Sequence, residues 1–228
     1  MKILFISDIH SNFEALKNLE KDIVESDFVF CLGDILGYHC EVNEVIDFLK
    51  KYSIICIAGN HDRYIINFDE VNGKSINESV KFGIEYSQKY ITEKNIKWLK
   101  SLPTSVSFTI NGTSIFCCHG SPWDVTNEYL YSNKKERIAQ MNNFNFDIIA
   151  FGHTHRMYEK ITSNKIIINP GSVGQARDEL GKICAKILDL DKREITNIVK
   201  GYNFKKVIDL ALKNGAKEWI YKHFPKEE

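Results

Sequence analysis

Short runs of apolar residues recur along the chain, and a polar turn follows each run. Because most of these runs are continuous rather than alternating, we expect strands that are covered on both faces. The predicted strands lie at Ile3–Ile6, Phe28–Leu32, Ile54–Ala58, Ser114–Cys118, Ile148–Phe151, Lys165–Ile168, Ile183–Leu188 and Ile195–Val199.

Amphipathic segments separate the first three predicted strands. Asn12 can cap a helix in which Phe13 and Leu16 share an apolar face. Residues 42–49 carry apolar side chains at the spacing i, i+3, i+4, i+7. The resulting order of strand, helix, strand, helix, strand predicts right-handed crossovers and a buried, mostly parallel sheet.

The second half of the chain has a different pattern. A polar, helix-compatible stretch over residues 64–102 ends at Pro103, and Asn111-Gly112 is a hairpin signal between two apolar runs. The later strands lie closer together, so we expect an α/β fold in which two mixed sheets face each other as a sandwich flanked by helices. An amphipathic helix at about residues 203–223 completes a single domain of residues 1–228.

Composition narrows the possible partners and the expected location. The 228 residues include 30 Lys+Arg and 30 Asp+Glu, so the formal net charge is zero, which argues against an extended surface for duplex nucleic acid. No apolar run approaches the ~20 residues of a membrane helix, and the N-terminus is too soon acidic for a signal peptide. None of the six cysteines forms a CxxC pair. We therefore expect a cytoplasmic protein with free thiols and no membrane partner.

Residue types that bind metals gather directly after five of the predicted strands. They are Asp8 and His10, Asp34, Asn60 and His61, His119, and His153 and His155. Because open α/β sheets bind ligands just outside the carboxyl ends of their strands, these turns can converge on one site.

The mixture of carboxylate, imidazole and carboxamide groups suits two divalent ions such as Mn, Fe, Zn or Ni. Two ions ~3.5–4 Å apart need a ligand that bridges them, and a carboxylate has the two oxygens for this. Asp34, central in the parallel part of the predicted sheet, is the candidate. A single turn of this kind is more often structural, since Asp, Asn and Gly are common in turns, but five such turns together predict a dinuclear hydrolase.

The motifs DxH, GD, GNHD, HG and GHTH occur in this order between Asp8 and His155. This order resembles the calcineurin-like metallophosphoesterase superfamily, whose fold is a double β-sheet sandwich flanked by helices. The sequence Asn169-Pro170-Gly171-Ser172-Val173-Gly174 extends the resemblance in the style of small prokaryotic members.

The resemblance implies a role for each position. It assigns to the first metal Asp8, His10 and His155; it makes Asp34 the bridge; and it assigns to the second metal Asn60, His119 and His153. His61 would face the substrate and protonate the leaving group, while a metal-bound hydroxide would attack phosphorus in line.

One departure from the family pattern narrows the range of expected substrates. Protein phosphatases of this superfamily carry GDxxDRG, whereas this chain has Gly33-Asp34-Ile35-Leu36-Gly37-Tyr38-His39 and lacks the second Asp and the Arg. The resemblance therefore favours the small phosphodiesterase-like branch and a small phosphodiester or nucleotide as substrate. Two alternatives stay open: a non-catalytic scaffold on the same fold, as in retromer, and a nuclease that acts on short nucleic acid.

Further candidates border these motifs. Asn12 could contact phosphate at the start of a helix or act only as its N-cap, and Arg177 could clamp phosphate in a bidentate manner or lie on the surface. The remaining candidates could line the site or pack within loops, with a stacking rim for a nucleobase as the functional alternative; they are Tyr38, His39, Trp123, Tyr129 and Tyr131. The oligomeric state is open.

Overall fold

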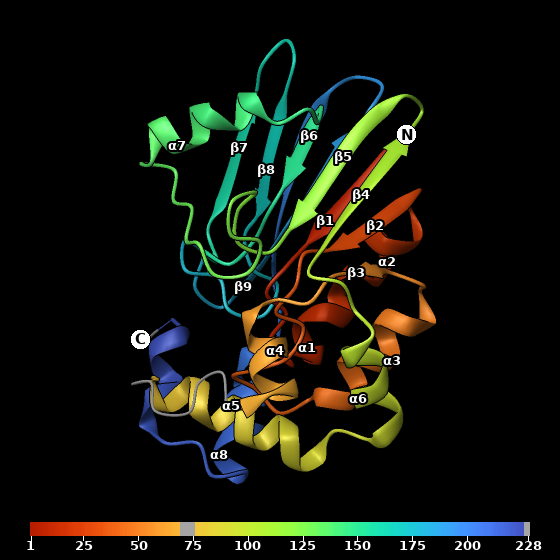
Figure 1. The fold of residues 1–228 in the computed structure, drawn as a ribbon. Coiled ribbons are helices and arrows are strands. Elements are labelled where there is room, and N and C mark those ends of the chain that lie inside the picture. Colours follow the sequence, from red (N-terminus) through yellow and green to blue (C-terminus); the bar gives the residue numbers. More distant parts are fainter. Residues whose placement is uncertain (69–75, 226–228) are drawn as a thin grey trace.

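The computed structural model describes residues 1–68 and 76–225. Residues 69–75, within the helix-compatible stretch of the sequence, and residues 226–228 lie outside the described residues. The strands form two five-stranded sheets. Figure 1 shows the strands together in its upper half and most of the helices below them.

The first sheet has the order β10-β9-β1-β2-β3. Its strands are β1 (Lys2–Ile6), β2 (Phe28–Cys31), β3 (Ile55–Cys56), β9 (Lys182–Asp189) and β10 (Glu194–Gly201). Strand β2 pairs parallel with both β1 and β3, while β9 pairs antiparallel with β1 and β10. The parallel part arises from the two crossovers between β1, β2 and β3, as the sequence predicted.

The second sheet has the order β4-β5-β6-β8-β7. Its strands are β4 (Ser105–Ile110), β5 (Thr113–Cys118), β6 (Ile148–Ala150), β7 (Met157–Ile161) and β8 (Ile166–Pro170). The β4–β5 hairpin turns at Asn111, whose φ is 48°, and Gly112, whose φ is 78°. Positive φ at both turn positions is what a type I′ hairpin requires. Strand β6 pairs parallel with β5 and β8, so this sheet also has a central parallel part.

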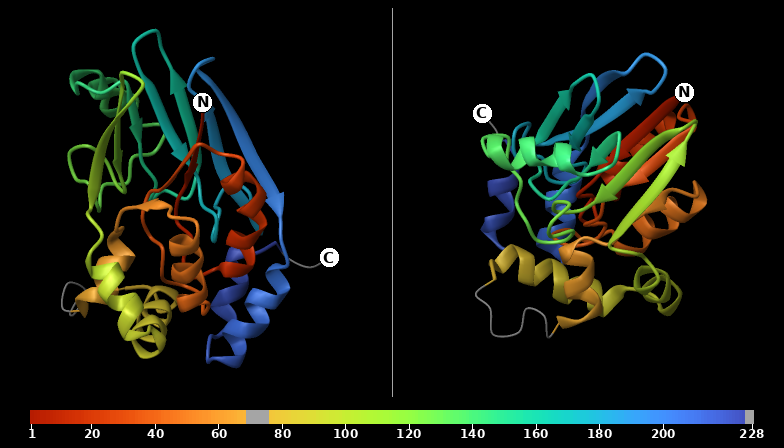
Figure 2. Two further views of the ribbon diagram at one scale, coloured as in Figure 1. Left: turned by 90° about the vertical axis from the view of Figure 1, so that its right-hand side faces the viewer. Right: turned by 45° about the horizontal axis from the view of Figure 1, so that its top comes forward.

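Helices cover the outer faces of the sandwich. They are α1 (Phe13–Leu16), α2 (Glu20–Val24), α3 (Val42–Lys51), α4 (Asn60–Ile66), α5 (Glu78–Tyr90), α6 (Glu93–Lys100), α7 (Lys135–Gln140) and α8 (Phe204–Lys213), with short 3-10 helices η1 (Lys17–Leu19), η3 (Met141–Asn143) and η4 (Glu218–His223). Figure 2 shows α7 beside the second sheet and the other helices together at the opposite end of the molecule. No helix among the described residues is long and apolar enough to cross a membrane.

Strand β1 shows why its sequence is a continuous apolar run. Ile3 and Phe5 pack into a core between the two sheets, where Phe30 stacks on Phe5 with ring centroids 5.6 Å apart. Leu4 and Ile6 point the other way, into a core between the first sheet and helices α1 to α6. Successive side chains of a strand point to opposite faces, so a strand with two covered faces is apolar throughout.

Strand β7 and the C-terminal helix are among the elements that differ from the sequence-based expectation. Strand β7 (Met157–Ile161) was not predicted, because it lies at a sheet edge and its last three residues, including Glu159 and Lys160, are exposed, so it forms no apolar run. The helix expected at about residues 203–223 ends at Lys213, and a separate 3-10 helix follows. Gly215, with a φ of 96°, ends the helical path between them.

Candidate metal centre

The turns that follow β1, β2, β3, β5 and β6 meet at one end of the sandwich. They bring together the side chains of Asp8, His10, Asp34, Asn60, His61, His119, His153 and His155, all of which are buried. The first sheet and α4 supply some of these side chains, and the second sheet supplies the others. The cluster therefore lies where the carboxyl ends of both parallel parts face each other.

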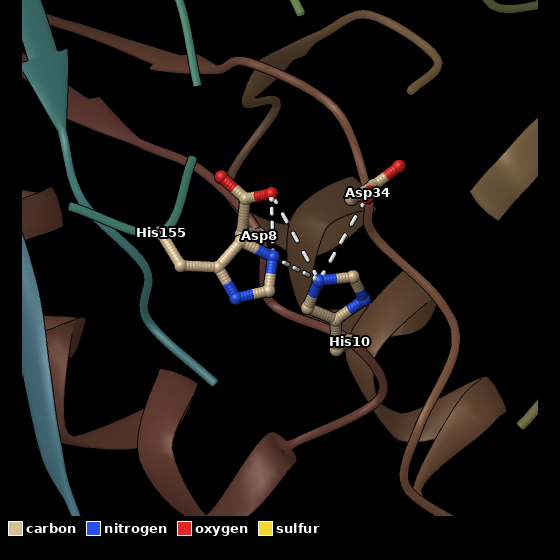
Figure 3. Close-up of side chains that lie close together, drawn as sticks. All are labelled: Asp8, His10, Asp34 and His155. Carbon is tan, nitrogen blue, oxygen red and sulfur yellow. Dashed lines mark hydrogen bonds and ion pairs between the residues drawn. The ribbon is translucent and has the colours of Figure 1, made fainter. Parts of the chain in front are cut away.

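One group of four side chains could hold a metal ion: Asp8, His10, Asp34 and His155. Figure 3 shows the two imidazole rings pointing toward each other between the two carboxylates. His155 Nε2 lies 3.0 Å from His10 Nε2 and 3.3 Å from Asp8 Oδ1. His10 Nε2 lies 3.8 Å from Asp8 Oδ1 and 3.7 Å from Asp34 Oδ2.

A second group shares Asp34 with the first and adds His119 and His153. His119 Nε2 lies 3.3 Å from Asp34 Oδ2 and 3.1 Å from His153 Nδ1. The amide oxygen of Asn60 lies 3.1 Å from the same His119 nitrogen. The ligand set that the sequence analysis assigned to two metals is therefore assembled in one place, with Asp34 between the two groups.

Backbone carbonyl groups fix the orientation of three imidazole rings. The Nδ1 atoms of His10, His119 and His155 lie 3.3, 2.7 and 2.8 Å from the carbonyl oxygens of Leu36, Leu32 and Gln175, respectively. A carbonyl can only accept, so each Nδ1 carries a proton, and in the neutral ring the lone pair of Nε2 faces the cluster. Histidine ligands of metals are commonly held by such hydrogen bonds from the other ring nitrogen.

The donor atoms fit a bound cation. His10 Nε2 and His155 Nε2 present lone pairs to each other at 3.0 Å, an arrangement that a cation between them would stabilise. The buried Asp8 Oδ1 has no hydrogen-bond partner among the described residues, and a buried carboxylate oxygen without a donor is costly. Borderline divalent ions accept this mixture of nitrogen and oxygen ligands.

The electrostatics of the cluster agree with this. Burial lowers the pKa of His10 well below its ordinary value and, with His119 nearby, lowers the pKa of His153 to about 3. Both rings are therefore neutral, as metal ligands must be. Burial alone would lower the pKa of His119, but the Asp34 and Asp8 carboxylates outweigh it and raise this pKa to about 9. The two carboxylates thus attract positive charge to the centre of the cluster.

The backbone is unusual at the positions of the candidate ligands. Five of them have a positive φ between 51° and 66°: Asp8, His10, Asp34, His153 and His155. Residues with a side chain adopt this left-handed conformation at a cost of roughly 1–2 kcal/mol, and such outliers gather at functional sites.

Glycine lets neighbouring turns approach closely. A Cβ atom at Gly59 would lie 2.1 Å from Asp34 Oδ1, and one at Gly152 would lie 2.9 Å from Asp8 Oδ2. Any larger residue at either position would displace a carboxylate of the cluster.

His61 lies at the border of the cluster, on the first turn of α4. Its Nε2 is 4.0 Å from Asp34 Oδ2, and its backbone N–H donates to Asp34 Oδ1 at 2.9 Å. Its ring packs edge-on against His10, with centroids 4.8 Å apart, and its Nδ1 has no hydrogen-bond partner among the described residues. Neither group of described side chains that could hold a metal ion includes His61.

The structure assigns different environments to Asn12 and Arg177. Asn12 caps α1 by accepting from Ala15 N at 3.0 Å, and its amide donates to Gly174 O and the Tyr202 hydroxyl. Both amide protons are therefore used, which favours the N-cap over a phosphate contact. Arg177 is half-buried next to the cluster, and its backbone N–H donates to His155 O at 3.0 Å.

The aromatic candidates divide into two sets. Tyr38 contacts His10 edge-on at 4.6 Å between centroids, and Tyr129 stacks on His153 at 3.7 Å, so both lie against candidate ligands. Tyr131 stacks on Tyr129 at 5.9 Å. In contrast, Trp123 packs on Phe144 and under Arg137, and the His39 ring is buried beside Phe224 with centroids 6.0 Å apart.

Sequence analysis assigned no role to Asp62, which holds the turns in place. Its carboxylate accepts backbone N–H groups of Gly59, Ile35 and Leu36 at 2.9 to 3.2 Å. It therefore joins the turn after β2 to the start of α4, and so positions Asp34 relative to Asn60. The GNHD motif contains this residue, but its hydrogen-bond partners are backbone groups, which no motif identifies.

Comparisons with known proteins agree with this geometry. A family model described as the calcineurin-like phosphoesterase superfamily domain matches residues 1–193. A protein of Methanocaldococcus jannaschii, described as uncharacterized, is 31% identical over 241 residues that cover 96% of this chain and 95% of its own. The structure of a metallophosphoesterase from Sphaerobacter thermophilus has a TM-score of 0.81 and 26% identity and covers 98% of this chain and 97% of its own. A hypothetical protein from Pyrococcus horikoshii has a TM-score of 0.85 and 19% identity, with 99% of each chain covered.

Proposed function

Because the chain belongs to the calcineurin-like phosphoesterase superfamily, we propose that it hydrolyses phosphoesters with the help of two divalent cations. The observation that carries this proposal is the shared position of Asp34. It is the one residue common to both groups of described side chains that could hold a metal ion, as the ligand that bridges two cations must be.

The proposed ligand sets follow the two groups. One cation would be held by Asp8, His10 and His155, Asp34 would bridge, and the other cation would be held by Asn60, His119 and His153. Mn, Fe, Zn and Ni suit these donors. Two bound cations of this kind lower the pKa of coordinated water and stabilise the negative charge on a phosphoryl group.

The residues around the ligands complete the proposed active site. His61 lies against the cluster, and its Nδ1 has no hydrogen-bond partner in the described part of the chain, so it can donate a proton to the oxygen of the leaving group. Arg177 is held next to His155 by its backbone, where a guanidinium group can bind phosphate oxygens. Because the GDxxDRG pattern of protein phosphatases is absent from this sequence, we propose a small phosphodiester or nucleotide as the substrate.

The experiment that tests this function combines metal analysis with turnover. We expect purified protein to bind two equivalents of Mn²⁺ or Ni²⁺ and, in that form, to hydrolyse p-nitrophenyl phosphate or its bis ester. The same measurement with Mg²⁺ compares these transition metals with a hard ion that prefers oxygen ligands. Folded protein that binds no transition metal and hydrolyses neither ester would contradict the proposal and support a non-catalytic scaffold. Cleavage of short oligonucleotides alone would support the nuclease.

A further inference from the structure

Tyr129 is an exposed aromatic residue beside the candidate ligands. Its ring stacks on His153 with centroids 3.7 Å apart and planes inclined by 26°, yet the residue is 41% exposed. Tyr131 lies nearly parallel to it, with an angle of 8° between the two planes. A tyrosine that only fills a core would be covered, so the exposed part of Tyr129 is available to another molecule.

The loop that carries Tyr129 is held in place on both sides. Asp124 Oδ1 accepts the backbone N–H groups of Thr126 and Asn127 at 3.2 and 3.0 Å. Arg137 donates to Glu128 at 3.0 Å. The carbonyl oxygen of Asn127 lies 3.2 Å from His153 Nε2, which joins the loop directly to the cluster. The ring is therefore presented in a fixed position, and binding to it requires little ordering of the loop.

A positive charge lies near the same ring. The backbone N–H of Arg177 is bound to His155 O, and its side chain hydrogen-bonds Tyr38, whose ring packs on His10. An aromatic face and a guanidinium group thus border the same buried cluster. Base stacking on an aromatic ring together with phosphate binding by arginine is the chemistry with which proteins hold nucleotides.

We propose that Tyr129 is the stacking platform for a nucleobase, and that the substrate is a phosphodiester with a nucleoside on one side of the phosphate. This inference rests on the proposed phosphoesterase function. Trp123 has no part in it, because its ring packs on Phe144 and Arg137 rather than on a candidate ligand.

The arrangement also suggests which group on the phosphate lies near Tyr129 and which lies near His61. Contacts run from His61 to Asp34, from Asp34 to His119, and from His119 to His153, on which Tyr129 stacks. In this proposal the nucleoside stays on the phosphate beside Tyr129, and the leaving group faces His61, the proposed acid. Hydrolysis breaks the P–O bond to the leaving group and forms a P–O bond to the oxygen of water. The products are an alcohol, protonated by His61, and a nucleoside monophosphate.

Two substrates with the same leaving group test the platform: the p-nitrophenyl ester of thymidine 5′-phosphate, and ethyl p-nitrophenyl phosphate. In the Mn²⁺-loaded protein we expect kcat/KM to be at least about 10-fold higher for the thymidine ester, since stacking of one base on an aromatic ring contributes about 5- to 100-fold. Tyr129→Ala should remove most of this preference through KM, and Tyr129→Phe should keep it. Tyr90→Ala is the matched control, because Tyr90 is 45% exposed but packs on Tyr86 of the same helix.

A binding measurement separates this inference from the proposed function. By calorimetry, we expect AMP to bind wild-type protein at least about 5-fold more tightly than ribose 5-phosphate, and Tyr129→Ala to abolish the difference. If both esters are hydrolysed equally and AMP has no advantage, the platform is refuted while the phosphoesterase stands. If neither ester is hydrolysed, the proposed function fails and the calorimetry alone decides the platform. If Tyr129→Ala does not fold, the preference of the wild-type protein and of Tyr129→Phe decides it.

Discussion

Single residues in this protein owe their roles to atoms of the backbone as much as to their own chemistry. The imidazole of His119 presents Nε2 to Asp34 because Leu32 O holds its other nitrogen at 2.7 Å. His155 is oriented in the same way by Gln175 O. Such partners tune a ligand without being visible in its motif.

The shared position of Asp34 leads to a prediction for Asp34→Asn. The neutral amide offers one oxygen and no negative charge, so it bridges two dications poorly, and we expect loss of metal at both positions and loss of activity. Metal content after dialysis, measured by mass spectrometry, checks this. Two tightly bound metals per chain in the variant would refute the bridge. Asp47→Asn, at an exposed carboxylate on α3, is the control.

His61→Ala should keep both metals but lower turnover. A positioned acid contributes typically ~10²–10⁴-fold, and the loss should be largest for an alkyl leaving group, which must be protonated as it departs. It should be smaller for p-nitrophenolate, which leaves as an anion. Turnover rates of His61→Ala and the wild-type protein, measured for both leaving groups, check this role.

Two other outcomes for His61→Ala would change the assignment. Equal losses for both leaving groups would indicate charge stabilisation without proton transfer. A lost metal would make His61 a ligand, and full activity toward the alkyl ester would exclude it as the acid.

At the residue scale, the sequence predicted which side chains meet but not how they are held. Asp8, Asp34 and His119 could be found because each lies within three residues of the end of a strand, and strand ends converge. The exposed ring of Tyr129 could not be placed, since it belongs to a long loop whose path depends on hydrogen bonds such as those to Asp124 Oδ1.

At the scale of elements, helix α5 supports the site through one close contact. A Cβ atom at Gly83 would lie 2.0 Å from the backbone nitrogen of Tyr38 and 2.7 Å from the carbonyl carbon of Gly37. The helix therefore touches the backbone of the turn after β2. Tyr38 in turn packs on the His10 and His61 rings, so the position of α5 is coupled to the site.

Gly83→Ala should reverse the usual effect of alanine in a helix. Alanine normally favours a helix by roughly 0.5–1 kcal/mol over glycine, but the overpacked contact here should destabilise the fold by about 1–3 kcal/mol and lower activity. Urea unfolding and turnover check both effects. The control is Gly201→Ala, where a Cβ meets nothing within 4 Å. A more stable and fully active Gly83→Ala would show that α5 can move freely.

Elements with two covered faces were the easiest to predict. The runs of β1, β2 and β5 gave the parallel strands and the hairpin, and the predicted two-sheet fold is confirmed. The edge strand β7 was not found in this way, because it is held by backbone pairing with β8 rather than by burial of its own side chains. Pairing of this kind leaves no periodic signal in the sequence.

At the scale of the whole molecule, the site connects the two sheets. Asp8 and Asp34 follow strands of the first sheet, whereas His119 and His153 follow strands of the second. A cation bound between them would link the two halves of the sandwich, so removal by a chelator should lower the melting temperature as well as activity.

The cysteines should be inert in the folded molecule. All six are buried, and burial raises the pKa of Cys184 to about 12 and that of Cys118 well above its ordinary value. The thiolate is the reactive form, so iodoacetamide at neutral pH should modify native protein slowly and leave activity intact. Mass spectrometry shows the adducts, with denatured protein as the positive control. Loss of metal after mild modification would show that a thiol supports the site.

The left-handed backbone of the candidate ligands has a consequence for how the chain tolerates change. Glycine adopts such φ values without the cost of roughly 1–2 kcal/mol that a side chain incurs. In a library of all single substitutions, glycine should be tolerated better than alanine in a selection for folding, but not in one for hydrolysis, at Asp8, His10, Asp34, His153 and His155. Positions at which glycine variants survive the selection for folding but are lost in the selection for hydrolysis would then identify the active site. The frequency of each variant, measured by sequencing, is the only data needed.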